Sequence, residues 1–292
     1  MGTRNNMKRV CVSILILLAA SLSLGAAGET YRNDLTLRKD GEVQIKSDVP
    51  DITIIQESRG DSAAVTLTGA ARDRYSMTVR EDRDGIFVEV KRKQRLGIDL
   101  FQTLDAHLTV TLPNSWTEGE LSVSTVSGQL KIPGPLYAEE VELHSVSGSI
   151  GFDSLSTTDS LEIASVSGSI EGKTIEAGDV GITSVSGAIM IDKIISTSRS
   201  DVEVGSVSGA IKLPLLDASN ATVESISGAI SVTLPRTFGG RVSASSLSGS
   251  ISTSIDGVHD LSTEKRTQTF AVGNGSASLE VSTTSGAIRI AQ

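Results

Sequence analysis

The sequence predicts an all-β protein, folded as a single-stranded parallel β-helix with about 20 residues per coil and three short strands in each coil. Three observations lead to this fold class. A short motif that ends in Ser-Gly occurs eight times. Successive motif serines are separated by 20, 20, 19, 22, 19, 21 and 37 residues, and a period near 20 is typical of stacked repeats. Apolar and polar residues alternate around each motif, which indicates strands with one buried face.

Each position of the repeat has a recurring residue type. With the motif serine as position 0, positions −6 and −4 are apolar, position −2 is always hydroxylic, and position +3 is leucine or isoleucine. In the copy around Ser167 these residues are Leu161, Ile163, Ser165 and Ile170. Stacked coils would therefore place equivalent side chains in rows, with about 4.8 Å between layers.

The alternation changes phase inside the motif. The apolar positions −1, +3 and +5 are in phase with one another but not with −6 and −4. We therefore expect a bend or bulge near the hydroxylic position −2, with position −1 directed inward. Position +1 would also face inward, where close approach of backbone requires glycine. The predicted structural repeat glycines are Gly128, Gly148, Gly168, Gly187, Gly209, Gly228, Gly249 and Gly286.

A meander of β-hairpins joined by Ser-Gly turns is the rival interpretation. It is disfavoured because Ser-Gly is a weaker hairpin signal than Asn-Gly, and because hairpins would not require the same residue types at −2 and +3 in every copy. The interval of 37 residues is close to two periods, which suggests a coil that has lost its Ser-Gly. A third strand per coil is predicted from a further apolar residue at +8, namely Leu155, Ile175, Ile194 and Leu216.

Residues 1–28 have the features of a signal peptide. Arg4, Lys8 and Arg9 form a basic start, an apolar run follows over 10–24, and small residues predict cleavage near Ala27 or Gly28. The apolar run is short for a membrane span, and an uncleaved anchor is the alternative. We therefore expect an exported protein that is periplasmic, on the outer surface or extracellular. Its only cysteine, at position 11, would leave with the signal, so no disulfide is expected.

The charge of the chain limits its partners. The net charge is −9, and removal of the three basic residues of the signal makes it −12, from 23 basic and 35 acidic residues. Such a charge disfavours nucleic acid and anionic lipid. Aromatic residues make up only 3% of the chain, which leaves few platforms for stacking on sugars.

The mature chain divides into two predicted regions. Residues 29–115 are β-rich without the repeat and are expected to be a capping region with degenerate first coils. Residues 116–292 are expected to be the regular β-helix, with an irregular coil at 256–276. The basic run 91–95 could dock phosphate or polysaccharide, but such runs are more often simply solvated.

The recurrent Val-Ser-Gly-x-Ile, the Leu-Thr-Val-Thr-Leu-Pro at 108–113 and the glycine-rich 273–275 before a final coil resemble the bacterial putative-adhesin β-strand-repeat family. The resemblance covers about residues 42–290. It implies an exported domain of unknown function with a β-helix fold and a role at the surface, and it supplies no catalytic or ligand-binding residues.

The sequence offers no recognisable set of catalytic, cofactor-binding or metal-binding residues, and no cofactor is expected. His107, His144 and His259 are far apart and lack metal-ligand spacing. No G-x-S-x-G motif occurs. The best argument for an enzyme is a set of acidic residues at the outward position −5, interrupted by glycine and threonine: Glu142, Glu162, Glu203 and Glu280. Surface charge that keeps a flat face soluble explains the same residues.

The leading hypothesis is a non-enzymatic envelope or cell-surface module with an adhesin-like or structural role. Its partner would be an unknown protein or glycan of the envelope or surface, with self-association possible and no nucleic acid. The alternatives are a β-helical polysaccharide lyase or hydrolase that uses the −5 glutamates, and an accessory protein of an envelope-stress pathway.

Overall fold

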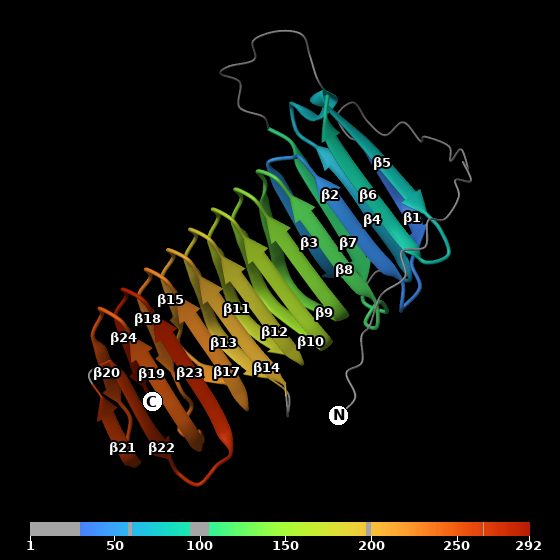
Figure 1. Cartoon of the computed structure of the whole chain (residues 1–292). Coiled ribbons are helices and arrows are strands. Elements are labelled where there is room, and N and C mark those ends of the chain that lie inside the picture. Colours follow the sequence, from blue (N-terminus) through green and yellow to red (C-terminus); the bar gives the residue numbers. More distant parts are fainter. Residues whose placement is uncertain (1–29, 58–59, 94–104, 197–199, 265) are drawn as a thin grey trace, which may run out of the picture.

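The structure, a computed structural model, describes residues 30–57, 60–93, 105–196, 200–264 and 266–292. Over these residues the chain is all-β apart from one short 3-10 helix, η1 (Arg72–Arg74). The strands stack along one axis into an elongated, solenoid-like body (Figure 1). The all-β, solenoid-like fold predicted from the repeat is confirmed. The described part of the chain has no helix with the length and hydrophobicity to cross a membrane.

In every coil, one strand ends at the hydroxylic position −2. The residues at −6, −4 and −2 of this strand all face inward and are buried. These strands pair in parallel and in register, so that Leu121, Val141, Leu161 and Val180 follow one another one layer apart. In stacking order, the row consists of β8 (Glu120–Thr125), the ends of β9 (Gln129–Ser145) and β10 (Ile150–Ser165), β12 (Asp179–Ser184), β14 (Asp201–Ser206), β17 (Asn220–Ser225), β23 (Ala277–Thr283) and β19 (Gly240–Ser246).

A second row of strands begins at position +3 of each repeat with a leucine or isoleucine, which is buried in every copy except the last of the stack, where Ile251 is partly buried. Besides the first halves of β9 and β10, it contains β11 (Ile170–Ala177), β13 (Ile189–Ser196), β15 (Ile211–Leu213), β18 (Ile230–Thr233), β24 (Ile288–Ala291) and β20 (Ile251–Ser254). The apolar residues at +8 are buried and in register farther along these strands, and the last of them begins a separate strand, β16 (Leu216–Asp217).

The turn between the two rows corrects one expectation from the sequence. Position −2 is buried, and in every copy except that of Ser184 its hydroxyl accepts a hydrogen bond from the motif glycine, with 3.0 Å between Gly168 N and Ser165 Oγ. Position −1 points outward rather than inward, and Val166 is 45% exposed. The inward hydroxyl satisfies a backbone amide of the turn, so the phase of the alternation changes after position −2 and not before it.

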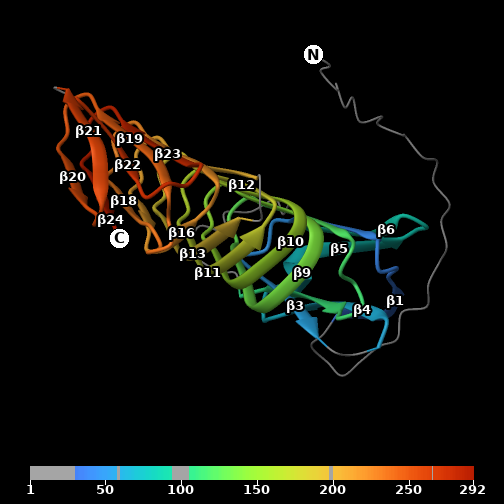
Figure 2. The same cartoon turned by 90° about the horizontal axis from the view of Figure 1, so that it is seen from below.

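The N-terminal end of the stack is covered by antiparallel strands (Figure 2). β2 (Glu42–Ser47) and β3 (Asp51–Glu57) pair in parallel with β8 and β9, and so form the first coil. On the other side of this coil β6 (Gly85–Arg92) lies parallel to β2, and β7 (His107–Pro113) lies parallel to β3. Three antiparallel pairs complete the end. In them β5 (Tyr75–Glu81) pairs with β6, β4 (Ser62–Thr68) pairs with β7, and β1 (Thr30–Thr36) pairs with β4.

The stacking order at the C-terminal end differs from the order in the chain. β23 pairs in parallel with β17 on one side and with β19 on the other, and β24 lies likewise between β18 and β20. The final coil is therefore inserted between two coils that precede it in the sequence. Residues 256–276 contain β21 (Val258–Glu264) and β22 (Thr267–Val272). These two strands pair with each other in antiparallel fashion, and β22 also pairs antiparallel with β19. The interval of 37 residues thus does not contain a coil that has lost its Ser-Gly.

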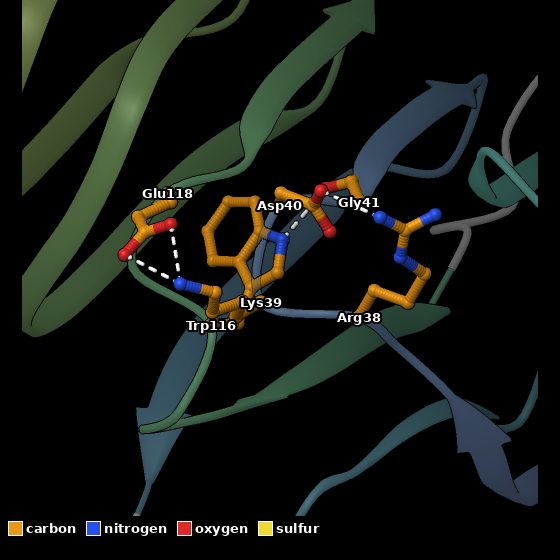
Figure 3. A network of polar contacts seen from close by, with 6 residues as sticks. All are labelled: Arg38, Lys39, Asp40, Gly41, Trp116 and Glu118. Atoms are coloured by element: carbon orange, nitrogen blue, oxygen red, sulfur yellow. Dashed lines mark hydrogen bonds and ion pairs between the residues drawn. The ribbon is translucent and has the colours of Figure 1, made fainter.

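A small network holds the first coil against the coil that begins at Glu120 (Figure 3). Trp116 is completely buried, and its indole Nε1–H donates a hydrogen bond to the carbonyl oxygen of Gly41 at 2.7 Å. Beside it, Lys39 Nζ lies 2.7 Å from Glu118 Oε2. These contacts join residues 39–41, before β2, to residues 116–118, just before β8 begins.

Candidate functional site: an apolar column beside a groove

Position −1 forms a row of exposed apolar side chains, which we call the apolar column. The backbone sets this row, because each motif serine from Ser147 onward donates its amide hydrogen to the carbonyl oxygen of position −1 in the adjacent coil, at 2.9 Å from Ser167 N to Val146 O. The side chains are 41% to 54% exposed. Thr284 interrupts the column between its last two members. In stacking order, the members are Val126, Val146, Val166, Val185, Val207, Ile226 and Leu247.

A groove runs along the column. It consists of two hollows of about 620 and 690 Å³ that share Ser165, Thr183 and Val185, and they are therefore continuous. The apolar column lines one side. The other side is position −3, which we call the −3 row. Most side chains of the −3 row are short, and they therefore leave a hollow beside the longer valine side chains of the column. Its central members are Ser124, His144, Ala164, Thr183 and Gly205.

Charge is absent from the column but present around it. Lys46 of β2 and Glu224 of β17 occupy position −3 at opposite ends of the central −3 row. Other carboxylates of the same strands lie at positions −7 and −5: Glu120, Glu140, Glu142, Glu162, Asp179, Asp201, Glu203 and Glu280. An uncharged apolar strip of this length, with the acidic rows to one side of it, is typical of an interaction surface.

The acidic rows cost stability at the N-terminal end. Desolvation by burial raises the pKa of the Glu42 carboxyl above its ordinary value of 4.5, and repulsion from Glu120, Asp82 and Asp84 raises this pKa further. The folded protein therefore holds the proton of Glu42 more tightly than the unfolded chain does. Ionised Glu42 lowers the free energy of unfolding, and this cost is absent below the unfolded pKa and complete above the folded one.

Glu42→Gln is expected to raise the melting temperature at pH 7, because glutamine removes a charge that the fold disfavours. The gain is a few tenths of a kcal/mol, since the carboxylate is partly screened by solvent. As the pH falls below about 4.5, protonated Glu42 and glutamine become equivalent and the gain should vanish. Calorimetric melting between pH 3 and pH 8 tests this. Glu176→Gln, at an exposed strand position paired with Ser156 and Ile195, is the control, and an equal gain there would contradict the assignment.

The glutamates considered for catalysis are not gathered into a site. Glu142 and Glu162 are one layer apart in register. Gly181 separates Glu162 from Glu203, and Thr222 separates Glu203 from Glu280. Neither hollow of the groove is lined by these four residues. The arrangement is an interrupted acidic stripe on an outward face.

The three histidines lie in different parts of the fold. His107 contacts two carboxylates, with 3.2 Å from its Nδ1 to Asp51 Oδ2 and 2.8 Å from its Nε2 to Asp105 Oδ1. His144 lines the groove, and His259 Nε2 is 2.8 Å from the carbonyl oxygen of Gly273. Within the ranges that the structure describes, no group of three or more His, Cys, Asp or Glu residues could hold a metal ion.

Two predicted features fall wholly or partly outside the described residues. The signal peptide over 1–28 is outside them, with Ala27 and Gly28, and so are residues 94 and 95 of the basic run. Within that run, Lys91 Nζ is 2.8 Å from Glu89 Oε1, and Lys93 Nζ donates a hydrogen bond to the carbonyl oxygen of Asp73 at 3.0 Å. Lys91 is thus paired with a carboxylate of its own strand, β6, and Lys93 is bonded to the 3-10 helix η1.

The repeat glycines stack on one another inside the turns. A Cβ added to Gly168 would fall on the carbonyl oxygen of Gly148, and one added to Gly187 would fall on that of Gly168. The same relation joins Gly209 to Gly187 and Gly228 to Gly209. These glycines set the distance between coils at the corner beside the apolar column.

Sequence reasoning missed the apolar column, although it identified every residue in it. Apolar character at −1 was assigned to the core, as it correctly was at −4 and +3. The signal that could have placed it outside is the hydroxyl at −2. A short side chain that accepts a hydrogen bond from the amide three residues ahead is typical of a turn, and it fixes −2 inward and −1 outward.

A family model described as Toastrack DUF4097 matches residues 41–291. Among solved structures, a putative adhesin from Bacteroides fragilis is similar with a TM-score of 0.52 and 13% identity, covering 91% of this chain and 98% of that one. A putative adhesin from Parabacteroides distasonis has a TM-score of 0.48 and 12% identity, covering 91% and 98%. A putative lipid binding protein from the same species has a TM-score of 0.40 and 13% identity, also covering 91% and 98%. No curated protein sequence matches the chain significantly.

Proposed function

This chain belongs to the Toastrack DUF4097 family, and we propose that it is a non-enzymatic exported module that binds a component of the cell envelope or cell surface. The contact is made by the apolar column and the groove beside it. The similar structure from Bacteroides fragilis, whose fold this chain shares, is described as a putative adhesin, and the proposal agrees with that description.

The apolar column is the observation that carries the proposal. It is rigid, because backbone hydrogen bonds between coils fix the valines, with 3.0 Å from Val166 N to Ser145 O. A rigid side chain loses little conformational entropy when a partner covers it. Each Å² of apolar surface removed from water contributes about 25 cal/mol, and none of this gain is offset by desolvation of charge on the column.

Two further parts of the proposal rest on the sequence. The basic start, apolar run and small residues of 1–28 support export to the periplasm, outer surface or exterior. We also take the coil to be the single-stranded, three-sided parallel β-helix, and the in-register residues at +8 support this geometry.

A polysaccharide-active enzyme receives less support. Acid–base hydrolysis requires two carboxyl groups that flank a sugar in a shaped site, and the −5 glutamates lie on an outward strand face away from the groove. An accessory role in an envelope-stress pathway would use the same surface for a protein partner.

Co-sedimentation tests the proposed function. The purified protein is mixed with envelope fractions and, separately, with isolated cell-wall glycan. Binding to one of them is expected, and Val185→Asp should weaken it about tenfold, because a charge then interrupts the column. Met190→Asp is the matched control, since Met190 is also exposed, at 42%, but lies on the second row of strands. Absence of binding to both materials, or equal loss in the two variants, would overturn the proposal.

A further inference from the structure

A small cavity, which we call the corner cavity, lies where the first coil meets the antiparallel strands that cover it. Its volume is about 310 Å³, at the lower end of the range for small-molecule sites. The turn between β2 and β3, the β5–β6 pair and the first motif turn all contribute to it. Its lining residues are Asp48, Pro50, Tyr75, Arg92, Val126 and Ser127.

A buried hydroxyl without a partner lies at this cavity. Tyr75 is 3% exposed, and among the described residues its hydroxyl has no hydrogen-bond partner. Tyr75 and Arg92 are paired across β5 and β6, so their side chains leave the same face of this pair. Burial raises the pKa of the Tyr75 phenol above its ordinary value, and the effects of Arg92, Asp48 and Arg74 on this pKa are smaller. The hydroxyl therefore keeps its proton and lacks an acceptor, which is costly for a buried group.

The backbone at the same corner also leaves donors unused. Pro50 occupies the glycine position of its turn and has no N–H, so the Ser47 hydroxyl accepts a hydrogen bond from the Val49 amide instead, at 3.2 Å. In later coils the amides at positions −1 and 0 donate to carbonyl oxygens of the adjacent coil, at 2.9 to 3.2 Å. Within the described ranges, the equivalent amides of Val126 and Ser127 make no such bond.

We propose that the corner cavity binds a small hydroxy carboxylate, the chemical class to which sugar acids belong. Its carboxylate lies between the Arg92 guanidinium and the Tyr75 hydroxyl, within reach of the amides and hydroxyl of the motif turn. A neighbouring hydroxyl of the ligand donates to Asp48. The inference goes beyond the proposed function, because the cavity takes a small ligand whether or not the apolar column binds the envelope.

Arg92 is the cation that remains for a ligand. In the basic run, Lys91 is paired with Glu89, and Lys93 is bonded to the carbonyl oxygen of Asp73. The Arg92 guanidinium lines the cavity and has no ion pair among the described residues. A guanidinium presents a rigid fork of N–H donors that matches the two oxygens of a carboxylate.

Asp48 selects the class of anion. One of its oxygens accepts a hydrogen bond from the Arg92 amide at 3.3 Å, and the carboxylate can accept a second hydrogen bond from a ligand hydroxyl. A carboxylate ligand carries one charge, which the Arg92 guanidinium balances. A phosphate group carries close to two charges at neutral pH, and Asp48 would repel the second. The cavity therefore favours a single carboxylate with a hydroxyl beside it.

Isothermal titration calorimetry of the purified protein with D-glucuronate tests the site. We expect a dissociation constant on the order of 1 mM. Glucose lacks the carboxylate and inorganic phosphate lacks the hydroxyls, and both should bind at least about tenfold more weakly. Arg92→Gln should weaken glucuronate binding at least about tenfold, because the charge-assisted hydrogen bonds are lost. Arg80→Gln is the matched control, since Arg80 is exposed on β5 and lies over the Phe87 ring, 5.5 Å from its centroid.

Tyr75→Phe separates binding from a structural role. It should weaken glucuronate binding several-fold, yet leave the melting temperature of the free protein unchanged or higher, because it removes a buried hydroxyl without a partner. A lower melting temperature with unchanged binding would overturn the inference. So would a wild-type protein that binds no glucuronate, or binds glucose or phosphate equally well, or an Arg92→Gln variant that binds as wild type does.

The corner cavity and the proposed function have separate readouts. Val185 lines the groove but not the corner cavity. Val185→Asp should therefore weaken co-sedimentation with envelope material and leave glucuronate binding unchanged, whereas Arg92→Gln should abolish glucuronate binding. Loss of glucuronate binding in Val185→Asp would contradict a site at this corner.

Discussion

Gly187→Val is expected to destabilise the protein by about 2–4 kcal/mol and to lower its melting temperature accordingly. The valine Cβ would occupy the position of the Gly168 carbonyl oxygen. Backbone atoms of two hydrogen-bonded coils cannot move apart without breaking the ladder on both sides of the turn. Gly187→Ala should already destabilise, since the first added carbon makes the clash. Urea unfolding followed by circular dichroism measures both variants.

Gly181→Val is the matched control for this prediction. Gly181 lies six residues earlier in β12 on the outward face, and the nearest atom to an added Cβ is the carbonyl oxygen of Leu161, at 4.0 Å. Valine there has room and favours a strand, so stability should be unchanged or slightly higher. If Gly187→Val and Gly181→Val unfolded at the same urea concentration as wild type, the glycines would not set the distance between coils.

Trp116→Ala is expected to destabilise the protein by about 3–5 kcal/mol, because it removes a large, completely buried side chain and leaves a cavity. It also removes the donor to the Gly41 carbonyl oxygen. Trp116→Phe should cost less, since phenylalanine fills most of the space but leaves that carbonyl without its partner. Because the stack is quasi-one-dimensional, the loss should fall mainly on the first coil and its cover.

Trp116 is the only tryptophan, so its variants are followed by far-ultraviolet circular dichroism rather than by fluorescence. Tyr137→Ala is the control: Tyr137 is 51% exposed, and its removal should change stability by less than about 0.5 kcal/mol. Hydrogen exchange should show faster opening of β2 and β3 in Trp116→Ala than in wild type, with the coils from β10 onward unaffected. Uniform acceleration along the whole stack would contradict a local role for Trp116.

The parts of the fold that follow from local alternation could be predicted from the sequence. Leu161, Ile163 and Ile170 are buried where the period places them, because burial of one strand face is a property of neighbouring residues. The family resemblance, drawn from the same motif, also agrees with the matched family.

Periodicity alone could not predict which of two neighbouring residues faces inward, or which distant strands pair with each other. Val166 is apolar like Ile163, but the hydroxyl of Ser165 occupies the inward position between them. Likewise, the 37-residue interval between Ser248 and Ser285 gives the length of the connecting segment, but it does not say where in the stack the final coil lies. The insertion of β23 between β17 and β19 depends on pairing between strands distant in the sequence, which no local pattern encodes.

That insertion has a consequence for how the molecule is made. Residues 277–291 fill a gap between two coils synthesised before them, so until these residues emerge, β17 and β19 each expose an unpaired edge one coil from the end of the stack. An early stop codon that removes only β23 and β24 would therefore split the stack internally rather than shorten it. The stack is therefore completed by β23 and β24 only after the strands on both sides of them have been synthesised.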